Sequence, residues 1–282
     1  MPAAPNLFKS DLAQKCLGDD YKYEGKVEAK SALPQGVAIK GTVTRAEKDG
    51  KVAAVVELKK SLHKVEIVGK IDHVGAASVS AEHASLSPGF TVKLEAGLSG
   101  KSAKLTADLK RELLTASSSF DPFKKLIAAN GSLSYRSVSV GLSSSYCYAD
   151  GKQKGFAAPE GAVQYGGGHY QVSANVRKWG DEMSLRYHHS FSKDVSLGVS
   201  LDQRTSGDKN KETNLEFAVG TEIKIDPTST IKAKLSNEGV ISAVYSQKIK
   251  PNATVKISGT VDTSRLTRNN AHKIGIALLM DL

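Results

Sequence analysis

The chain of 282 residues contains only two cysteines, Cys16 and Cys147, and a single tryptophan. So few cysteines exclude a disulfide-stapled secreted scaffold, and we expect two free thiols. No stretch approaches the ~20 continuous apolar residues that a membrane-spanning helix needs. The protein is therefore either soluble or crosses a membrane as β-strands, which turn only every second side chain toward lipid.

Residues 1–17 lack the apolar core and the cleavage site of a secretory signal, and they lack the Arg-rich, acid-free character of a matrix-targeting peptide. A bacterial outer-membrane barrel would need such a signal, whereas a mitochondrial outer-membrane barrel would not. If the strands cross a membrane, we expect it to be the mitochondrial outer membrane.

Signatures of catalysis and metal binding are also missing. The seven histidines are scattered, and the adjacent pair His188 and His189 would face opposite sides of a strand. The segment 97–102 resembles a phosphate-binding loop but has two residues between its glycines where that loop needs four, which favours a hairpin turn. We expect no enzyme, no metal site and no required cofactor.

The chain carries 39 lysines and arginines against 29 aspartates and glutamates, a formal net charge of +10. Such a field attracts anions. The basic residues recur along the whole sequence instead of clustering with aromatics, so we expect small anionic partners and no nucleic acid.

From Tyr21 onward, apolar and polar residues alternate with a period of two, as in strands 9–11 residues long. The clearest runs are residues 183–188, 195–202, 231–235 and 254–262. Turn-forming pairs such as Asp49-Gly50 and Asp150-Gly151 separate the runs and predict hairpins. One face of each strand is apolar, and the other carries Ser, Thr, Lys, Arg, Asp and Glu.

This pattern continues through residues 22–282 without helical cover. Open twisted sheets rarely exceed ~10 strands, whereas a repeat of about 14 residues supplies about 18–20. Closure into one barrel with an aqueous channel removes the unpaired edges. A soluble all-β protein that binds anions would alternate in the same way and remains an alternative.

The N-terminus has a different period. Phe8, Leu12 and Cys16 fall on one stripe of a helix, and Pro5 and Gly18 suit its two ends. We predict a short helix over residues 6–17, a helical segment at 1–20 and a barrel at 21–282.

Residues 225–237 read Ile-Asp-Pro-Thr-Ser-Thr-Ile-Lys-Ala-Lys-Leu-Ser-Asn. This segment is similar to the signature of the eukaryotic porins, the voltage-dependent anion channel family, although Ile223 stands where the family usually has Tyr or His. Residues 247–251 resemble its Leu-Lys-Pro-Gly turn, with Asn252 in place of Gly. Residues 272–278 look like its closing strand, and residues 88–94 resemble its Gly-Leu-Lys region with the lysine displaced to Lys93.

This resemblance implies a single transmembrane β-barrel of about nineteen strands, one parallel closing pair and the N-terminal helix inside the pore. It further implies a voltage-gated, anion-preferring diffusion pore for ATP, ADP, phosphate and small metabolites. Nucleotides, NADH among them, would be permeant or weakly bound ligands, and a homo-oligomer and cytosolic kinases are the expected protein partners. The related protein-import barrel, which favours an acidic lumen, is a rival that the positive charge disfavours.

Three sets of site residues follow from alternation and resemblance. Strand parity assigns the strand lysines Lys93, Lys232, Lys234 and Lys256 to the lumen, because a charge facing lipid at the midplane costs ~2–4 kcal/mol. The resemblance adds Lys9 and Lys15 of the N-terminal helix, and these six lysines form the expected anion-contact set. The resemblance also implies NADH contact at Val240, Ile241, Ser242, Ser258, Gly259, Thr260, Val261 and Asp262. It implies a barrel-insertion signal at Lys273, Gly275, Leu278 and Met280.

Overall fold

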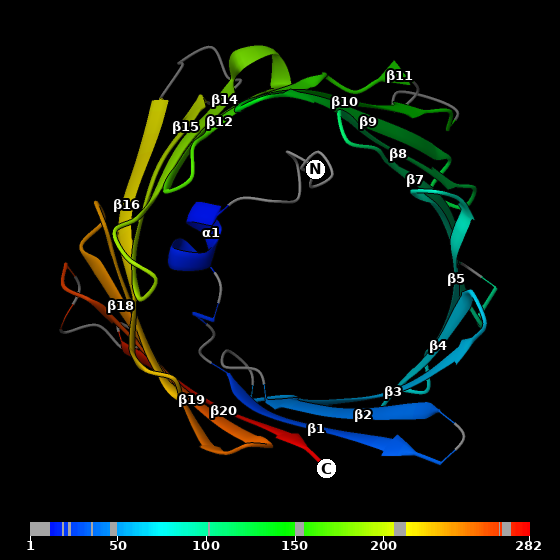
Figure 1. The fold of residues 1–282 in the computed structure, drawn as a ribbon, viewed down its shortest axis with the longest axis horizontal. Coiled ribbons are helices and arrows are strands. Elements are labelled where there is room, and N and C mark those ends of the chain that lie inside the picture. Colours follow the sequence, from blue (N-terminus) through cyan, green and yellow to red (C-terminus); the bar gives the residue numbers. More distant parts are fainter. Residues whose placement is uncertain are drawn as a thin grey trace.

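The computed structural model is a closed β-sheet around a central lumen, with one short helix inside it (Figure 1). It describes residues 12–18, 20–21, 24–34, 36–45, 50–100, 102–149, 155–205, 213–264, 266 and 272–282. The helix α1 covers Leu12–Leu17. In these ranges no helix is long and apolar enough to cross a membrane.

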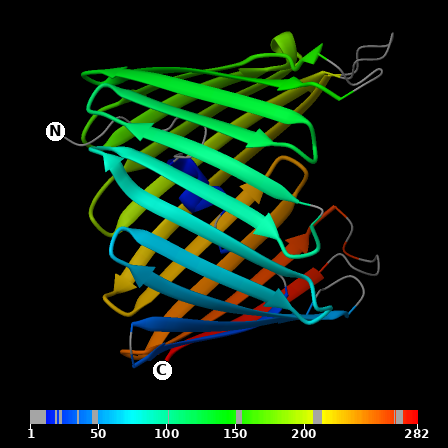
Figure 2. The same cartoon turned by 90° about the vertical axis from the view of Figure 1, so that its right-hand side faces the viewer.

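The strands run in chain order around the barrel and lie obliquely across it (Figure 2). Their bounds are β1 Gly25–Leu33, β2 Val37–Arg45, β3 Val52–Leu62, β4 Val65–Asp72, β5 Ala77–Ser87, β6 Phe90–Gly97, β7 Ala103–Lys110, β8 Leu114–Asp121, β9 Leu126–Tyr135, β10 Val138–Cys147, β11 Gly155–Phe156, β12 Glu160–Gly166, β13 Tyr170–Arg177, β14 Glu182–Ser190, β15 Val195–Thr205, β16 Thr213–Asp226, β17 Ser229–Ser236, β18 Val240–Lys250, β19 Ala253–Asp262 and β20 His272–Asp281.

These segments make a barrel of nineteen strands. The two-residue β11 pairs with one end of β10, at Tyr146 and Cys147, while β12 pairs with the other part of β10, from Val138 to Ser143. Because β11 and β12 lie on the same side of β10, they act as one interrupted strand. The expected all-β barrel of about nineteen strands is confirmed.

The barrel closes through a parallel pair. β1 and β20 run side by side in register from Gly25 opposite Ile276 to Lys30 opposite Asp281, and the Leu282 amide donates to the Lys30 carbonyl at 2.6 Å. Each other neighbouring pair is antiparallel, as consecutive hairpins require. An odd number of strands makes the first and last run in the same direction, so the single parallel pair is also confirmed.

The predicted alternation corresponds to real strands. The runs at 183–188, 195–202, 231–235 and 254–262 lie within β14, β15, β17 and β19. The turn-forming pairs predicted at 49–50 and 150–151 include residues outside the described ranges. The turn at 87–89 joins β5 to β6, where Gly89 adopts a φ of 77° that suits glycine. The segment 97–102 joins β6 to β7, and the Gly97 amide donates to the Ser102 carbonyl, so the hairpin prediction there is confirmed.

The predicted helix is also present inside the lumen. Its described part is α1, Leu12–Leu17, and residues 6–11 of the predicted span lie outside the described residues. The buried apolar side chains of the described chain are Ala13, Cys16, Leu17, Ala162 and Val244, three of them on α1. The molecule therefore has little packed core, and its burial is concentrated where the helix meets the wall.

Candidate functional site: the lumen wall and the N-terminal segment

Cross-strand register assigns every strand residue to one of two faces. Lys232 and Gly198 contact α1 and therefore face the lumen, and their pairing partners share that face. On the opposite, outward parity, the described strands carry charges only near strand ends, such as Lys60 and Lys250. Leu185 and Ile257 illustrate the usual outward residue, apolar and 47% exposed. This is the surface of a barrel that faces lipid outside and water inside.

Helix α1 sits in a shallow seat made by two glycines. Gly198 of β15 and Gly220 of β16 are directly paired and both face the lumen. A Cβ at position 198 would lie 2.9 Å from the Cys16 Cβ, and one at position 220 would lie 2.8 Å from the Cys16 carbonyl oxygen. Only glycine lets the helix approach this closely, and the approach leaves Cys16 0% exposed.

Polar contacts fix both ends of α1. The Leu12 amide donates to the Gln171 side-chain oxygen at 3.1 Å. At the other end, the Lys232 ammonium donates to the Lys15 carbonyl at 2.9 Å, and the Tyr21 hydroxyl donates to the Cys16 carbonyl at 2.9 Å. These donors satisfy carbonyls that the last helical turn leaves unpaired, and a cation there also complements the helix dipole.

An ionic cluster ties the chain after α1 to the wall. The Asp20 carboxylate lies 3.1 Å from the Lys232 ammonium and accepts a hydrogen bond from the Lys256 ammonium. Lys232 also lies 3.5 Å from Glu222. Burial alone would raise the pKa of Asp20, but the two ammonium donors outweigh burial and hold that pKa below its usual range.

The buried position of Cys16 lowers the reactivity of its thiol. Burial raises the pKa of its thiol, and its sulfur lies 3.4 Å from the Ser196 hydroxyl. Neither cysteine is in a disulfide, as expected. Access to the Cys16 thiol therefore depends on whether α1 stays on the wall.

The predicted anion-contact lysines fall into separate environments. Lys232, Lys234 and Lys256 lie together on β17 and β19 beside α1 and Asp20, and the Lys234 ammonium lies 4.7 Å from the Tyr21 ring centre. Lys15 is exposed on α1. Lys9 lies outside the described residues. Three of the predicted lysines are thus brought together by strand pairing.

Lys93 faces the lumen on β6, far along the strand order from the others. Its ammonium pairs with Glu95 of the same strand, and Glu82 is its cross-strand neighbour. A cavity of about 550 Å³ in this sector is lined by both signs of charge, including Glu57, Glu66 and Lys70. The positive charge of Lys93 is therefore balanced locally.

The residues predicted to contact NADH divide between the two faces. Val240, Ser242, Ser258, Thr260 and Asp262 share the lumen parity of β18 and β19, whereas Ile241, Gly259 and Val261 have the outward parity. A solute in the lumen can reach only the first group.

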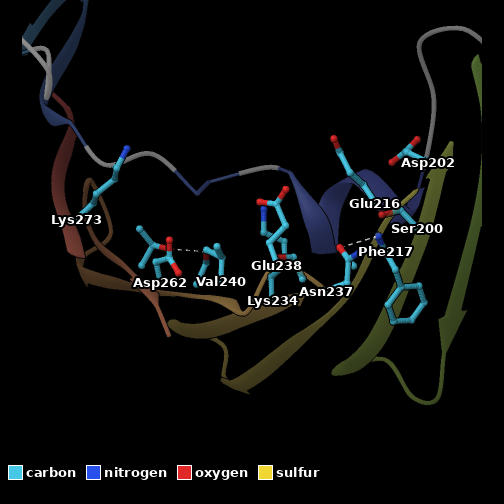
Figure 3. A pocket seen from close by; sticks show the side chains of 14 residues that line it. Ser200, Asp202, Glu216, Phe217, Lys234, Asn237, Glu238, Val240, Asp262 and Lys273 are labelled. Atoms are coloured by element: carbon cyan, nitrogen blue, oxygen red, sulfur yellow. Dashed lines mark hydrogen bonds between the residues drawn. The ribbon is translucent and has the colours of Figure 1, made fainter. Parts of the chain in front are cut away.

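Four of that group line a cavity of about 470 Å³ with Lys234 and Lys273 (Figure 3): Val240, Ser242, Thr260 and Asp262. Asp202, Glu216 and Glu238 face the same space from neighbouring strands and turns. The lining therefore carries more carboxylates than ammonium groups, which opposes stable binding of a dinucleotide at this point.

The predicted insertion signal lies on the closing strand β20. Lys273 and Gly275 have the lumen parity, and Leu278 and Met280 have the outward parity. The two apolar residues therefore face lipid, and the lysine faces the lumen.

Sequence reasoning missed Asp20, Glu222 and the two glycines of the seat. An isolated glycine inside a strand signals close approach of another backbone, and this signal was available at Gly198 and Gly220. Asp20 carries no pattern of its own, because its role depends on where the N-terminal segment folds back. Among the described residues, no group of three or more His, Cys, Asp or Glu side chains could hold a metal ion.

Known proteins resemble this chain along nearly its whole length. Residues 2–275 match the family model of the eukaryotic porins. The chain is 26% identical over 285 residues to mitochondrial outer membrane protein porin 5 of Oryza sativa subsp. japonica, covering 98% of both chains. It is 25% identical to the mitochondrial outer membrane protein porin of Candida albicans, over 89% of both, and 24% identical to an outer plastidial membrane protein porin of Zea mays, over 99% of both. This match agrees with the closed barrel of nineteen strands, its internal helix and its outward face almost free of charge. The chain therefore belongs to the eukaryotic porin family and is a diffusion pore of the mitochondrial outer membrane, not an enzyme.

Proposed function

We propose that this porin is an anion-preferring, voltage-gated pore that passes ATP, ADP, phosphate and small organic acids. The observation that supports this most directly is the confinement of charge. The outward parity of the described strands is nearly uncharged, so the excess of 39 basic over 29 acidic residues acts on the lumen and its mouths. A lumen with surplus cations favours anions by field alone, without a binding site.

Nucleotides, including NADH, are proposed as permeant or weakly held ligands. Lys232, Lys234 and Lys256 offer the cations nearest the N-terminal segment. Lys232 and Lys256 are already engaged with Asp20, and such neutralised cations attract a passing phosphate only weakly. Weak contact suits a pore, because a solute must leave as readily as it enters.

For voltage gating, we propose that the N-terminal segment, residues 1–20, is the element that moves. It carries charged groups across part of the field, and the transmembrane potential acts on each charge by ~2.3 kcal/mol per 100 mV. Residues 21–282 would form the fixed barrel. We also propose a homo-oligomer and docking of cytosolic kinases as the protein contacts of this pore.

The deciding experiment is the conductance of the refolded protein in a planar bilayer with a salt gradient. We expect stepwise currents, a reversal potential that reports anion preference, and closure at both voltage polarities. A cation-selective pore would instead assign the chain to the import-type relatives. A protein that stays soluble without detergent and conducts nothing would favour the anion-binding alternative.

A further inference from the structure

Asp20 occupies a position that a small oxyanion could take. Its two carboxylate oxygens point at two ammonium groups from different strands, Lys232 of β17 and Lys256 of β19. The side chains of these lysines are only 11% and 29% exposed, so the wall holds both cations in place. Two converging ammonium groups recognise phosphate as well as carboxylate, because both present oxygens of negative charge.

The charges around this position leave room for a stronger anion. Lys26 of β1 lies in the same row of the wall as Lys256, separated by Ala277, and lines a small cavity of about 80 Å³ beside Asp20. The facing carboxylates are Glu222, 3.5 Å from Lys232, Glu28, 2.8 Å from Lys26, and Glu24, which lines the same cavity. Without Asp20, the carboxylate in contact with the pair Lys232 and Lys256 would be Glu222, which leaves one positive charge of this pair in excess.

We propose that Lys232 and Lys256 form an anion site in which Asp20 is the built-in ligand, and that a phosphate group exchanges with Asp20 and releases Asp20 and α1 from the wall. The proposal deepens the proposed function and rests on it, since the competing anions are those that the pore would conduct. No covalent step is involved.

Release of Asp20 would loosen α1 as well. Lys232 holds both Asp20 and the carbonyl of Lys15, so an anion that draws this ammonium away weakens both contacts. Asp20 competes as a tethered ligand, with an effective concentration in the millimolar range. A phosphate dianion carries the larger charge, so free phosphate should compete at ~1–10 mM.

The buried Cys16 provides a readout that does not involve conduction. In a full-length Cys147→Ser variant it is the single thiol, and it is 0% exposed while α1 is seated. The rate at which an uncharged maleimide labels it in lipid vesicles measures how often α1 leaves the wall. Labelling is measured against inorganic phosphate and against sodium chloride at equal ionic strength.

We expect phosphate to raise the labelling rate several-fold, with a midpoint in the millimolar range, while chloride has little effect. Asp20→Asn should label roughly tenfold faster without phosphate, because charge-assisted hydrogen bonds are lost, and should no longer respond to phosphate. Glu112→Gln is the matched control, since Glu112 is exposed in the β7–β8 turn, whereas α1 contacts β14–β17, and this variant should behave as the parent.

Equal acceleration by chloride and phosphate would show ionic screening and overturn the site. An unchanged rate in Asp20→Asn would overturn the role of Asp20 as its ligand. A phosphate-insensitive rate in the parent, found together with an anion-selective conductance, would overturn the exchange while leaving the proposed pore function intact.

Discussion

Gly198 and Gly220 have no side chains, and this lets the helix α1 approach the wall closely. At Gly220, a methyl group would lie 2.8 Å from the Cys16 carbonyl and 3.1 Å from Leu17. We therefore expect Gly220→Ala to lift α1 from its seat and to raise the labelling rate of Cys16 by about tenfold or more, as overpacking of a tight contact usually costs ~1–3 kcal/mol.

The control for this change is Gly69→Ala on β4. Gly69 has the outward parity, and nothing lies within 4 Å of the Cβ that it would gain. The barrel should fold and Cys16 should label at the parent rate. Equal rates in Gly220→Ala and the parent would mean that the helix does not depend on the glycine seat.

At the same scale, parity predicts opposite effects for neighbouring residues. Leu185 of β14 has the outward parity, and Ser184 beside it faces Asp202 in the lumen. We expect Leu185→Lys to destabilise the barrel in lipid by ~2–4 kcal/mol, because a charge then faces hydrocarbon, and Ser184→Lys to leave stability nearly unchanged. Urea unfolding in vesicles, followed by the gel mobility of the folded form, measures both.

At the scale of elements, the strands were predictable from sequence and the placement of the N-terminal segment was not. Alternation in residues 254–262 is a local signal, so it identified β19 and the lumen face of Lys256. The contact between Asp20 and that lysine spans 236 residues and leaves no local pattern. The family resemblance predicts a helix inside the pore, and the structure shows that this helix rests on Gly198 and Gly220.

The register of the closing pair gives an element-scale prediction. Ala29 lies opposite Met280 in the parallel pair of β1 and β20. In a background without the two native cysteines, Ala29→Cys with Met280→Cys should cross-link upon mild oxidation, because neighbouring strands bring these positions within disulfide reach. Ala29→Cys with Leu279→Cys places the thiols on opposite faces and should not. Gel mobility under non-reducing conditions distinguishes the two.

For the whole molecule, selectivity follows from the sum of lumen charges and not from one site. Lys104 has the lumen parity on β7. We expect Lys104→Glu to bring the reversal potential in a salt gradient closer to zero, since it removes positive charge from the conduction path. Lys104→Arg should conserve the parent value. Lys64→Glu, which makes the same change of charge in the β3–β4 turn, should have a smaller effect.

The parallel pair of β1 and β20, which closes the barrel, also sets an order of events during assembly. Each antiparallel pair joins strands that are close in sequence, so hairpins can form early and locally, whereas β1 and β20 bring residue 25 beside residue 276. Closing so long a loop is entropically costly and cannot begin until the end of the chain is available. Until then both terminal strands present unpaired edges that can recruit other chains. Pairing of β1 with β20 is thus the committing step, after which the barrel has no unpaired strand edge.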